Sequence, residues 1–387
     1  MRAVVTVLAV WGAGLGAAAQ FGKISVLYDV LGQAYAGASP VALGLIVSVV
    51  GIVGLIFGTT AGLFVAPVGP RRAIVAALVM GAGMSAVQAI GLGYPAMIAS
   101  RVVEGVSHLA IVVVGPTVIA GLAAERFRGL AMTLWSSFFG VTYAVLALIA
   151  PPVLGAFGAG AIYLGHAVWM MGMALGLWLL LPPDPRPAPQ ARVGVLAQHR
   201  DIYASPFLSA PAMGFFCYTF LYVALLTLLP PEVPSAYRAA AATGMPLISI
   251  LLSLTLGVWL LGRMSAVRVV QGGYLMAMPG FLLLALVWGQ GLGMVIAGLW
   301  VAGALGIVQG ASFAAIPELN AKPQDRAQAA GAIAQLGNLG TTTGTPVLAA
   351  LLIGAGPWGL ALVAGLACAL AVTLHAVQAA RRRRAPI

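Results

Sequence analysis

Charged residues are scarce in this chain. Only 7% of its 387 residues are Asp, Glu, Lys or Arg, whereas 61% are hydrophobic and the mean hydropathy is +1.05. A soluble globular protein is about 25% charged, because its surface must face water. This shortage excludes a soluble domain and indicates that the surface of the folded chain faces lipid.

Cysteines and catalytic motifs are scarce as well. Cys217 and Cys368 lie far apart inside apolar runs, so the sequence has no disulfide framework and no metal-ligand spacing. HExxH and GxSxG motifs are lacking, and His166, His199 and His375 are scattered. A membrane-embedded enzyme would need a clustered nucleophile, base or metal set. We therefore expect no enzyme activity, no metal and no cofactor.

The apolar runs are long and continuous, which excludes a β-barrel and predicts membrane-spanning helices of about 20 residues each. We predict an all-α membrane protein with twelve transmembrane helices. The predicted spans are 4–34, 41–66, 72–92, 96–123, 129–154, 159–181, 206–229, 243–262, 269–289, 292–315, 328–353 and 357–380. The apolar run that follows Arg2 is predicted to be the first span rather than a removed signal peptide.

The positions of the 19 basic residues explain the net charge of +11. Most of them lie at the chain ends or in alternate gaps between apolar runs, a bias typical of cytoplasmic loops. These are Arg2, Arg71, Arg72, Arg126, Arg128, Arg186, Arg192, Arg200, Arg263, Arg268, Lys322, Arg326 and Arg381–Arg384. The bias predicts that both termini are cytoplasmic and removes the reason to expect nucleic-acid binding. We expect the final arginine run to meet anionic lipid head groups.

One long polar break divides the chain into two nearly equal halves. It covers residues 182–205 and opens with the proline-rich stretch Pro182–Pro187, which prevents helix continuation. We predict a six-helix half at 1–181, a cytoplasmic linker at 182–205, a second six-helix half at 206–380 and a basic tail at 381–387. Equal halves around a central site are the arrangement expected of two repeats that move against each other.

Glycines recur at helical spacing in two predicted spans. Gly54, Gly58 and Gly62 lie in the second span, and Gly337, Gly340 and Gly344 lie in the eleventh. Such stripes let helix backbones approach closely in lipid. Two interpretations stay open, packing within one half or a seam between the halves. Glycines 12, 14 and 16 follow no strand, so a nucleotide-binding loop is excluded.

The stretch Gly62–Arg72 reads Gly-Leu-Phe-Val-Ala-Pro-Val-Gly-Pro-Arg-Arg. It resembles the loop between spans two and three of the major facilitator superfamily of secondary transporters, which typically reads Gly-x-Leu-x-Asp-Arg-x-Gly-Arg-Arg. The resemblance implies a cytoplasmic gate motif carried by Gly62, Gly69, Arg71 and Arg72. Ala66 stands where the family has its aspartate, so the usual carboxylate latch is missing from this position.

The fourth predicted span carries a second resemblance to the same family. Arg101, Glu104 and Gly105 match its Arg-x-x-(Gln/Glu)-Gly motif, and the whole-chain topology agrees with the fold of that family. The antiporter motif of span five is degraded here to Pro151–Ala156. The run Arg128–Phe139 resembles the cyanate-transporter-like branch of small-anion carriers more than it resembles the drug exporters of the family.

Charged side chains inside spans are the strongest functional signal, because each costs about 2.5–3.5 kcal/mol at the bilayer centre. These are Lys23 and Asp29 on the first span and Arg101 and Glu104 on the fourth. By helix rise, Asp29 is expected near Arg101, and Lys23 is expected near Glu104. His108 extends the stripe of the fourth span, which the resemblance places along the substrate path. Alternatively, such ion pairs only fix helix packing.

These residues lead to a hypothesis for transport. With Glu104 protonated, Lys23 and Arg101 leave the site positive and able to hold a small anion, and deprotonation expels the anion. Asp29 and His108 are further candidates for proton coupling. In the second half we expect Tyr218, Gln309 and Asn338 to orient substrate, although interhelical hydrogen bonding is the simpler role for each.

We therefore expect a monomeric secondary transporter in a bacterial inner membrane that moves a small anion together with protons. The alternative is a proton-driven efflux antiporter for drug-like or amphipathic compounds. A channel agrees less well with twofold repeats and buried charge pairs.

Overall fold

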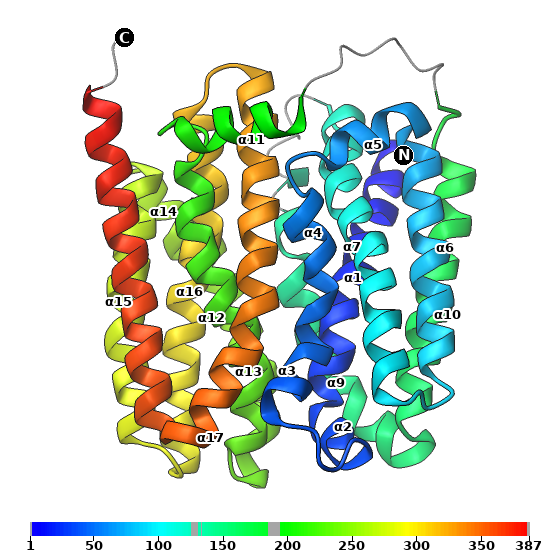
Figure 1. The fold of residues 1–387 in the computed structure, drawn as a ribbon, viewed down its shortest axis with the longest axis vertical. Helices are drawn as coiled ribbons and strands as arrows, with labels where there is room; N and C mark the ends of the chain where they lie inside the picture. Colours follow the sequence, from blue (N-terminus) through cyan, green and yellow to red (C-terminus); the bar gives the residue numbers. More distant parts are fainter. Residues whose placement is uncertain (1, 125–130, 133, 185–193, 385–387) are drawn as a thin grey trace. The chain divides into compact units, whose positions relative to one another are not determined.

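The computed structural model describes residues 2–124, 131, 132, 134–184 and 194–384, without the side chains of residues 62–64, 66, 195 and 323. Throughout these ranges the regular structure is helical (Figure 1). The first group of helices is α1 (Arg2–Val26), α2 (Tyr28–Ala34), α3 (Pro40–Ser48), the 3-10 helix η1 (Val49–Gly51), α4 (Ile52–Phe57), α5 (Ala61–Val68), α6 (Pro70–Gln88), α7 (Tyr94–Leu122), α9 (Phe138–Phe157) and α10 (Ala159–Leu180). The second group is α11 (Val195–Ala204), α12 (Ala210–Glu232), α13 (Ser235–Leu252), the π-helix η2 (Ser253–Gly257), α14 (Val258–Leu261), α15 (Ala266–Leu286), α16 (Gly291–Leu319) and α17 (Pro323–Arg384).

Within the described residues, ten helices are long and apolar enough to cross a membrane. This confirms an all-α membrane protein, whereas the count of twelve spans and the cytoplasmic termini stay predictions. Helix α6, with 19 residues, coincides with the predicted span 72–92. The long α17 is broken at Gly356, whose φ of 64° lies in the left-handed region, between the predicted eleventh and twelfth spans.

The chain divides into two compact units. Unit 1 comprises Met1–Ser39 and Leu45–Ala191, and unit 2 comprises Pro40–Gly44 and Arg192–Ile387. The division after residue 191 falls inside the predicted linker 182–205, and the domain boundaries proposed from the sequence stay a prediction.

Helix α1 runs through the core of unit 1, where it packs against α7, α9 and α10. Its glycines make this packing possible, because a Cβ at Gly12 or Gly16 would overlap the sulfur of Met173 or Met170 on α10. The close approach also exposes α1 carbonyls to α10, and Trp169 Nε1 donates to Gly12 O at 2.9 Å. The glycine-rich segment of α1 is therefore a contact surface for α10.

In unit 2, α12 packs along α17. A Cβ on Gly340 or Gly344 would overlap the backbone of Phe216 or Phe220 on α12. For the predicted eleventh span, the glycine stripe thus serves packing within one half, which decides between the two interpretations there. Cys217 of α12 and Cys368 of α17 are buried free thiols.

The linker helix α11 is tied to the end of α17 by the basic run. Arg381 Nη2 donates to Ala204 O at 2.8 Å, and Arg382 Nη1 donates to Pro206 O at 3.0 Å. Cationic side chains commonly satisfy the free carbonyls at a helix C-terminus, as Arg381 does for the end of α11. The run predicted to meet lipid head groups therefore also holds the linker against the helix bundle of unit 2.

Asp184 supplies a carboxylate to the start of α6. Its two carboxylate oxygens accept from Arg71 N at 2.8 Å and Arg72 N at 3.0 Å, and Gly69, with φ of 90°, leaves no space for a Cβ beside it. The first backbone N–H groups of a helix lack partners within the helix, so an acidic side chain stabilises them. The carboxylate missing at Ala66 is thus replaced by one from the segment that follows α10.

We expect Asp184→Ala to lower the free energy of unfolding by about 1 kcal/mol, because two N–H groups of α6 lose their acceptor. Thermal unfolding in detergent measures this loss. Asp201→Ala is the matched control, since its carboxylate is 70% exposed beside Arg200. Equal unfolding midpoints for the two variants would contradict the capping role.

Candidate functional site

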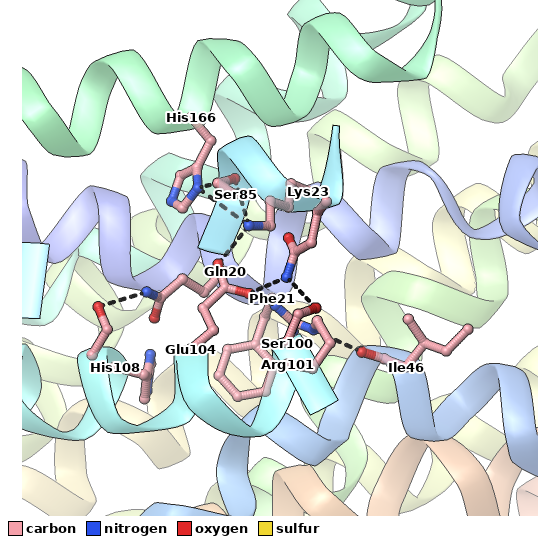
Figure 2. A network of polar contacts seen from close by, with 12 residues as sticks. Gln20, Phe21, Lys23, Ile46, Ser85, Ser100, Arg101, Glu104, His108 and His166 are labelled. Carbon is pink, nitrogen blue, oxygen red and sulfur yellow. Dashed lines mark hydrogen bonds and ion pairs between the residues drawn. The ribbon is translucent and has the colours of Figure 1, made fainter. Parts of the chain in front are cut away.

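Two cations and one carboxylate are buried together between α1 and α7. Lys23 of α1 and Arg101 and Glu104 of α7 have no exposed surface. Lys23 Nζ donates to Glu104 Oε1 at 2.5 Å, and Arg101 Nη1 donates to Glu104 Oε2. Glu104 therefore bridges both cations (Figure 2). When all three are ionised, two positive charges and one negative charge leave this cluster with a net charge of +1.

Helix α6 completes the polar surroundings of Glu104. Gln88 Nε2 donates to Glu104 Oε2 at 3.0 Å and to Ser100 Oγ at 3.1 Å. One turn earlier, Ser85 Oγ accepts from Lys23 Nζ at 2.8 Å. The carboxylate thus receives hydrogen bonds from Lys23, Arg101 and Gln88, an arrangement that satisfies a buried charge in the absence of water.

A histidine from α10 joins the cluster. His166 Nε2 lies 2.9 Å from Gly16 O, and its Nδ1 lies 2.9 Å from Ser85 Oγ and 3.3 Å from Lys23 Nζ. A carbonyl oxygen only accepts, so Nε2 carries the proton of the neutral ring and Nδ1 offers its lone pair to Ser85 and Lys23. We call Lys23, Ser85, Gln88, Arg101, Glu104 and His166 the charged cluster.

Arg101 also links α7 to the end of α3. Its Nε donates to Ile46 O at 2.9 Å, and its Nη2 donates to Val47 O at 3.0 Å. These carbonyls lie where α3 gives way to the 3-10 helix η1, and a cation is favourable at such a helix C-terminus. Gly105 allows the approach, because a Cβ there would overlap Val50 O. The Arg-x-x-Glu-Gly motif is therefore explained by contacts within unit 1.

The expected pairing of Arg101 with Asp29 is wrong. Helix α1 ends at Val26, and Asp29 lies on the separate short helix α2, where it is exposed. Arg101 is buried and takes Glu104 as its ion-pair partner. The prediction treated residues 4–34 as one continuous helix and compared depth alone, and depth does not specify the direction in which a side chain points. The pairing of Lys23 with Glu104 is as expected.

Ser85, Gln88 and His166 are members of the charged cluster that the sequence did not single out. Ser85 and Gln88 are three residues apart on a predicted span, so they share one helix face, and this spacing was the available signal. His166 gave no signal of its own, because its partners Gly16, Lys23 and Ser85 are distant in sequence.

His108 lies one turn beyond Glu104 on α7, as the spacing predicted. Its Nδ1 lies 3.0 Å from Ala17 O, and its ring meets Phe21 edge-on with centroids 5.1 Å apart. On the neighbouring turn, Gln20 Nε2 donates to Ser107 Oγ at 2.9 Å. These contacts fasten α7 to α1 beside the charged cluster.

The predicted substrate residues of the second half lie in unit 2. Tyr218 is buried on α12, with its ring stacked on Tyr222 at 5.1 Å. Asn338 is 8% exposed, and its Nδ2 donates to Ala334 O of its own helix at 2.7 Å. Gln309 is half-buried on α16. None of the buried residues described in unit 2 is an Asp, Glu, Lys or Arg.

The gate motif lies at the junction of α5 and α6. Arg71 stacks its guanidinium on Trp178 of α10 at 4.0 Å and donates to Trp178 O at 2.5 Å. Gly69 and Arg72 contact Asp184 as described above. Gly62 lies within α5, outside the described side chains. Residues 128–130 and 133 of the run that resembles the cyanate branch likewise lie outside the described residues.

Comparisons with known proteins agree with this architecture. A family model described as Major Facilitator Superfamily matches residues 6–241. The inner membrane transport protein YajR of Escherichia coli (strain K12) is 24% identical over 242 residues, which is 60% of this chain and 52% of that protein. The match thus spans about half the length of that relative. The crystal structure of the human organic anion transporter MFSD10 (TETRAN) superimposes with a TM-score of 0.72 at 18% identity, covering 96% of this chain and 99% of that chain. At this identity the likeness concerns the fold.

Removal of the shared carboxylate is expected to cost more stability than removal of either cation. Glu104→Gln leaves Lys23 and Arg101 buried without a counter-charge and should lower the free energy of unfolding by about 3–5 kcal/mol. Lys23→Met should cost less, because Arg101 and Gln88 continue to neutralise and bond Glu104. Thermal unfolding in detergent ranks the variants. Glu232→Gln, at an exposed position, is the matched control, and a Lys23→Met variant less stable than Glu104→Gln would contradict the shared-carboxylate arrangement.

Proposed function

The chain belongs to the Major Facilitator Superfamily, and from this premise we propose that it carries a small anion across the bacterial inner membrane together with protons. The family is one of secondary transporters rather than enzymes, so the transported solute is a small molecule and the chain acts by alternating access. The finer points, namely an anionic substrate, proton coupling and a monomeric state, rest on the chemistry of unit 1.

One observation carries the proposal, the excess of positive charge in the charged cluster. Lys23 and Arg101 share Glu104, and all three are fully buried. An isolated buried charge is costly in a membrane interior, so a site with surplus positive charge favours an anionic ligand. The opposite surplus would favour a cation, as expected of an exporter of lipophilic cations.

Glu104 is the group whose protonation would change this balance. Its carboxylate competes with any entering anion for Lys23 Nζ and Arg101 Nη1. Protonation of Glu104 removes that competition and raises the net charge of the cluster by one unit, which favours anion binding. Loss of the proton restores the ion pairs and expels the anion. Proton and anion therefore bind together and leave together, which is symport.

The remaining candidates have assigned places in this proposal. Arg101 holds α7 to the carbonyls of α3 and serves as a fixed positive charge, whereas Lys23, on α1, is the cation that contacts Ser85 and His166. Asp29 is proposed as an outer proton or cation site on α2, and His108 as a group that couples α7 to Ala17 of α1. In unit 2, Tyr218, Gln309 and Asn338 are proposed to orient oxygen atoms of the substrate.

Charge movement on a solid-supported membrane tests the proposal. Full-length protein in liposomes would be challenged with nitrate, cyanate, formate and lactate, with alanine as a zwitterion and with tetraphenylphosphonium as a lipophilic cation. We expect currents with one or more small anions in the wild type and their loss in Glu104→Gln. Glu232→Gln is the control for the same chemical change at an exposed position.

Two outcomes would overturn the proposal. Proton-driven anion currents that persist in Glu104→Gln would contradict the role of this carboxylate. Currents with tetraphenylphosphonium alone would place the protein among proton-driven efflux antiporters and recast Glu104 and Asp29 as cation sites.

A further inference from the structure

Lys23, Ser85 and His166 form a continuous hydrogen-bonded path from Glu104 to α10. Lys23 Nζ donates to Ser85 Oγ at 2.8 Å, and Ser85 Oγ lies 2.9 Å from His166 Nδ1. Because Nε2 of His166 donates to Gly16 O, Nδ1 is the acceptor, so the serine hydroxyl donates to it. The two hydrogen bonds from Lys23 through Ser85 to His166 thus run in one direction, while Lys23 Nζ also donates to Glu104 Oε1 (Figure 2).

We propose that Ser85 and His166 form a proton relay by which the proton on Glu104 leaves the charged cluster through Lys23. The inference rests on the proposed function, in which Glu104 gains and loses a proton. It adds Ser85 and His166 to that function and gives the proton a route. A carboxylate that gains and loses a proton would by itself require neither these two residues nor this route.

The transfer balances without any further reactant. The Lys23 ammonium breaks one N–H bond and gives that proton to Ser85 Oγ, while the Ser85 O–H bond breaks and its proton forms an N–H bond at His166 Nδ1. Protonated Glu104 then breaks its O–H bond and returns a proton to the Lys23 amine. The net result is an ionised Glu104, a charged Lys23 and a His166 imidazolium whose Nε2–H still bonds Gly16 O.

The charges around His166 make it only a temporary acceptor of the proton. Lys23 of α1 lies 3.3 Å from His166 Nδ1, and Glu104 and Arg101 of α7 also act on the ring. On α10, the helix of His166, the ring of Tyr163 lies 5.7 Å from Lys23 Nζ. From α6, the neutral Ser85 hydroxyl faces the His166 ring. An imidazolium and an ammonium so close repel each other, so the proton on His166 is driven to leave once water reaches the ring.

The location of the proton also changes how strongly the charged cluster ties α1 to α7. With Lys23 charged and Glu104 ionised, the strongest link is the ion pair from α1 to α7. While Lys23 is an amine during transfer, that ion pair is lost. The bonds from α1 to α10 at Gly16 O and to α6 at Ser85 remain, as do the uncharged contacts of Ala17 and Gln20 with α7. Movement of the proton is therefore coupled to the packing of α1, the helix that carries Lys23.

A pH jump without substrate tests the relay, with protons as the only probe. Full-length protein in liposomes on a solid-supported membrane would be stepped between buffers of equal chloride concentration and different pH. The wild type is expected to give a transient charge displacement as the cluster loses or gains protons. His166→Gln and Ser85→Ala are each expected to slow this relaxation by about 100-fold, the effect of losing a positioned acid or base.

Ser85→Ala separates a relay from a structural role, because Glu104 and His166 both remain and the displaced charge should stay the same while its rate falls. Thr142→Val is the matched control, since it too removes a buried hydroxyl that contacts α1. Thr142 Oγ1 donates to Leu15 O at 3.1 Å and has no described contact with Lys23. Thermal unfolding and gel filtration establish that each variant is folded, and Ser85→Ala decides the matter where His166→Gln aggregates.

The outcomes separate the relay from the proposed function. Wild-type relaxation rates in both His166→Gln and Ser85→Ala, or no transient in the wild type, would overturn the relay. A slowed transient in these variants with normal rates in Thr142→Val supports it. Because no transported anion is present, a normal wild-type transient combined with silence toward the anion panel would count against the proposed substrate alone.

Discussion

The need to give Lys23 and Arg101 an anionic partner away from water governs the organisation of unit 1. A single carboxylate, Glu104, is shared between them, and it requires donors from α1, α6 and α7 at once. The glycines of α1 follow from the same need, because side chains of α10 reach the backbone of α1 only where no Cβ intervenes. A buried ion pair is weak support for stability but imposes a specific arrangement of helices. The charged cluster thus fixes how four helices meet.

Much of the fold was predictable because lipid imposes simple rules on sequence. Apolar runs had to be helices, since every backbone polar group in hydrocarbon must be satisfied within its own segment. The pairing of Lys23 with Glu104 was predictable for a related reason, because charges deep in a membrane need partners. The depth of a residue in the membrane follows from its position along the helix and the rise per residue. By this relation, both Lys23 and Glu104 are predicted to lie near the bilayer centre.

The sequence-based predictions were wrong or incomplete where the depth of a residue in the membrane does not specify its contacts. The break at Leu27 turns Asp29 onto α2, and nothing in the apolar pattern of residues 4–34 marks that break. His166 was recognised only as a scattered histidine, because its role depends on contacts with two other helices, α1 and α6. The same holds for Asp184, which follows α10 in the chain but supplies a carboxylate near the position where Ala66 replaces the aspartate of the family motif. A local helix break decides the first case, and tertiary contacts between distant segments decide the other two.

Asp184 and the charged cluster illustrate a common property of such sites. A carboxylate at the start of α6 is required by the free N–H groups of Arg71 and Arg72, but any segment that reaches them can provide it. The charged cluster is less tolerant, because Glu104 must meet Lys23, Arg101 and Gln88 together, and a carboxylate displaced by one residue would point about 100° away. Motif matching therefore predicts the cluster better than the cap. It also follows that a chemical role for Glu104 depends on α1, α6, α7 and α10 keeping their present register, so that any movement which exchanges the proton must preserve or restore that register in each cycle.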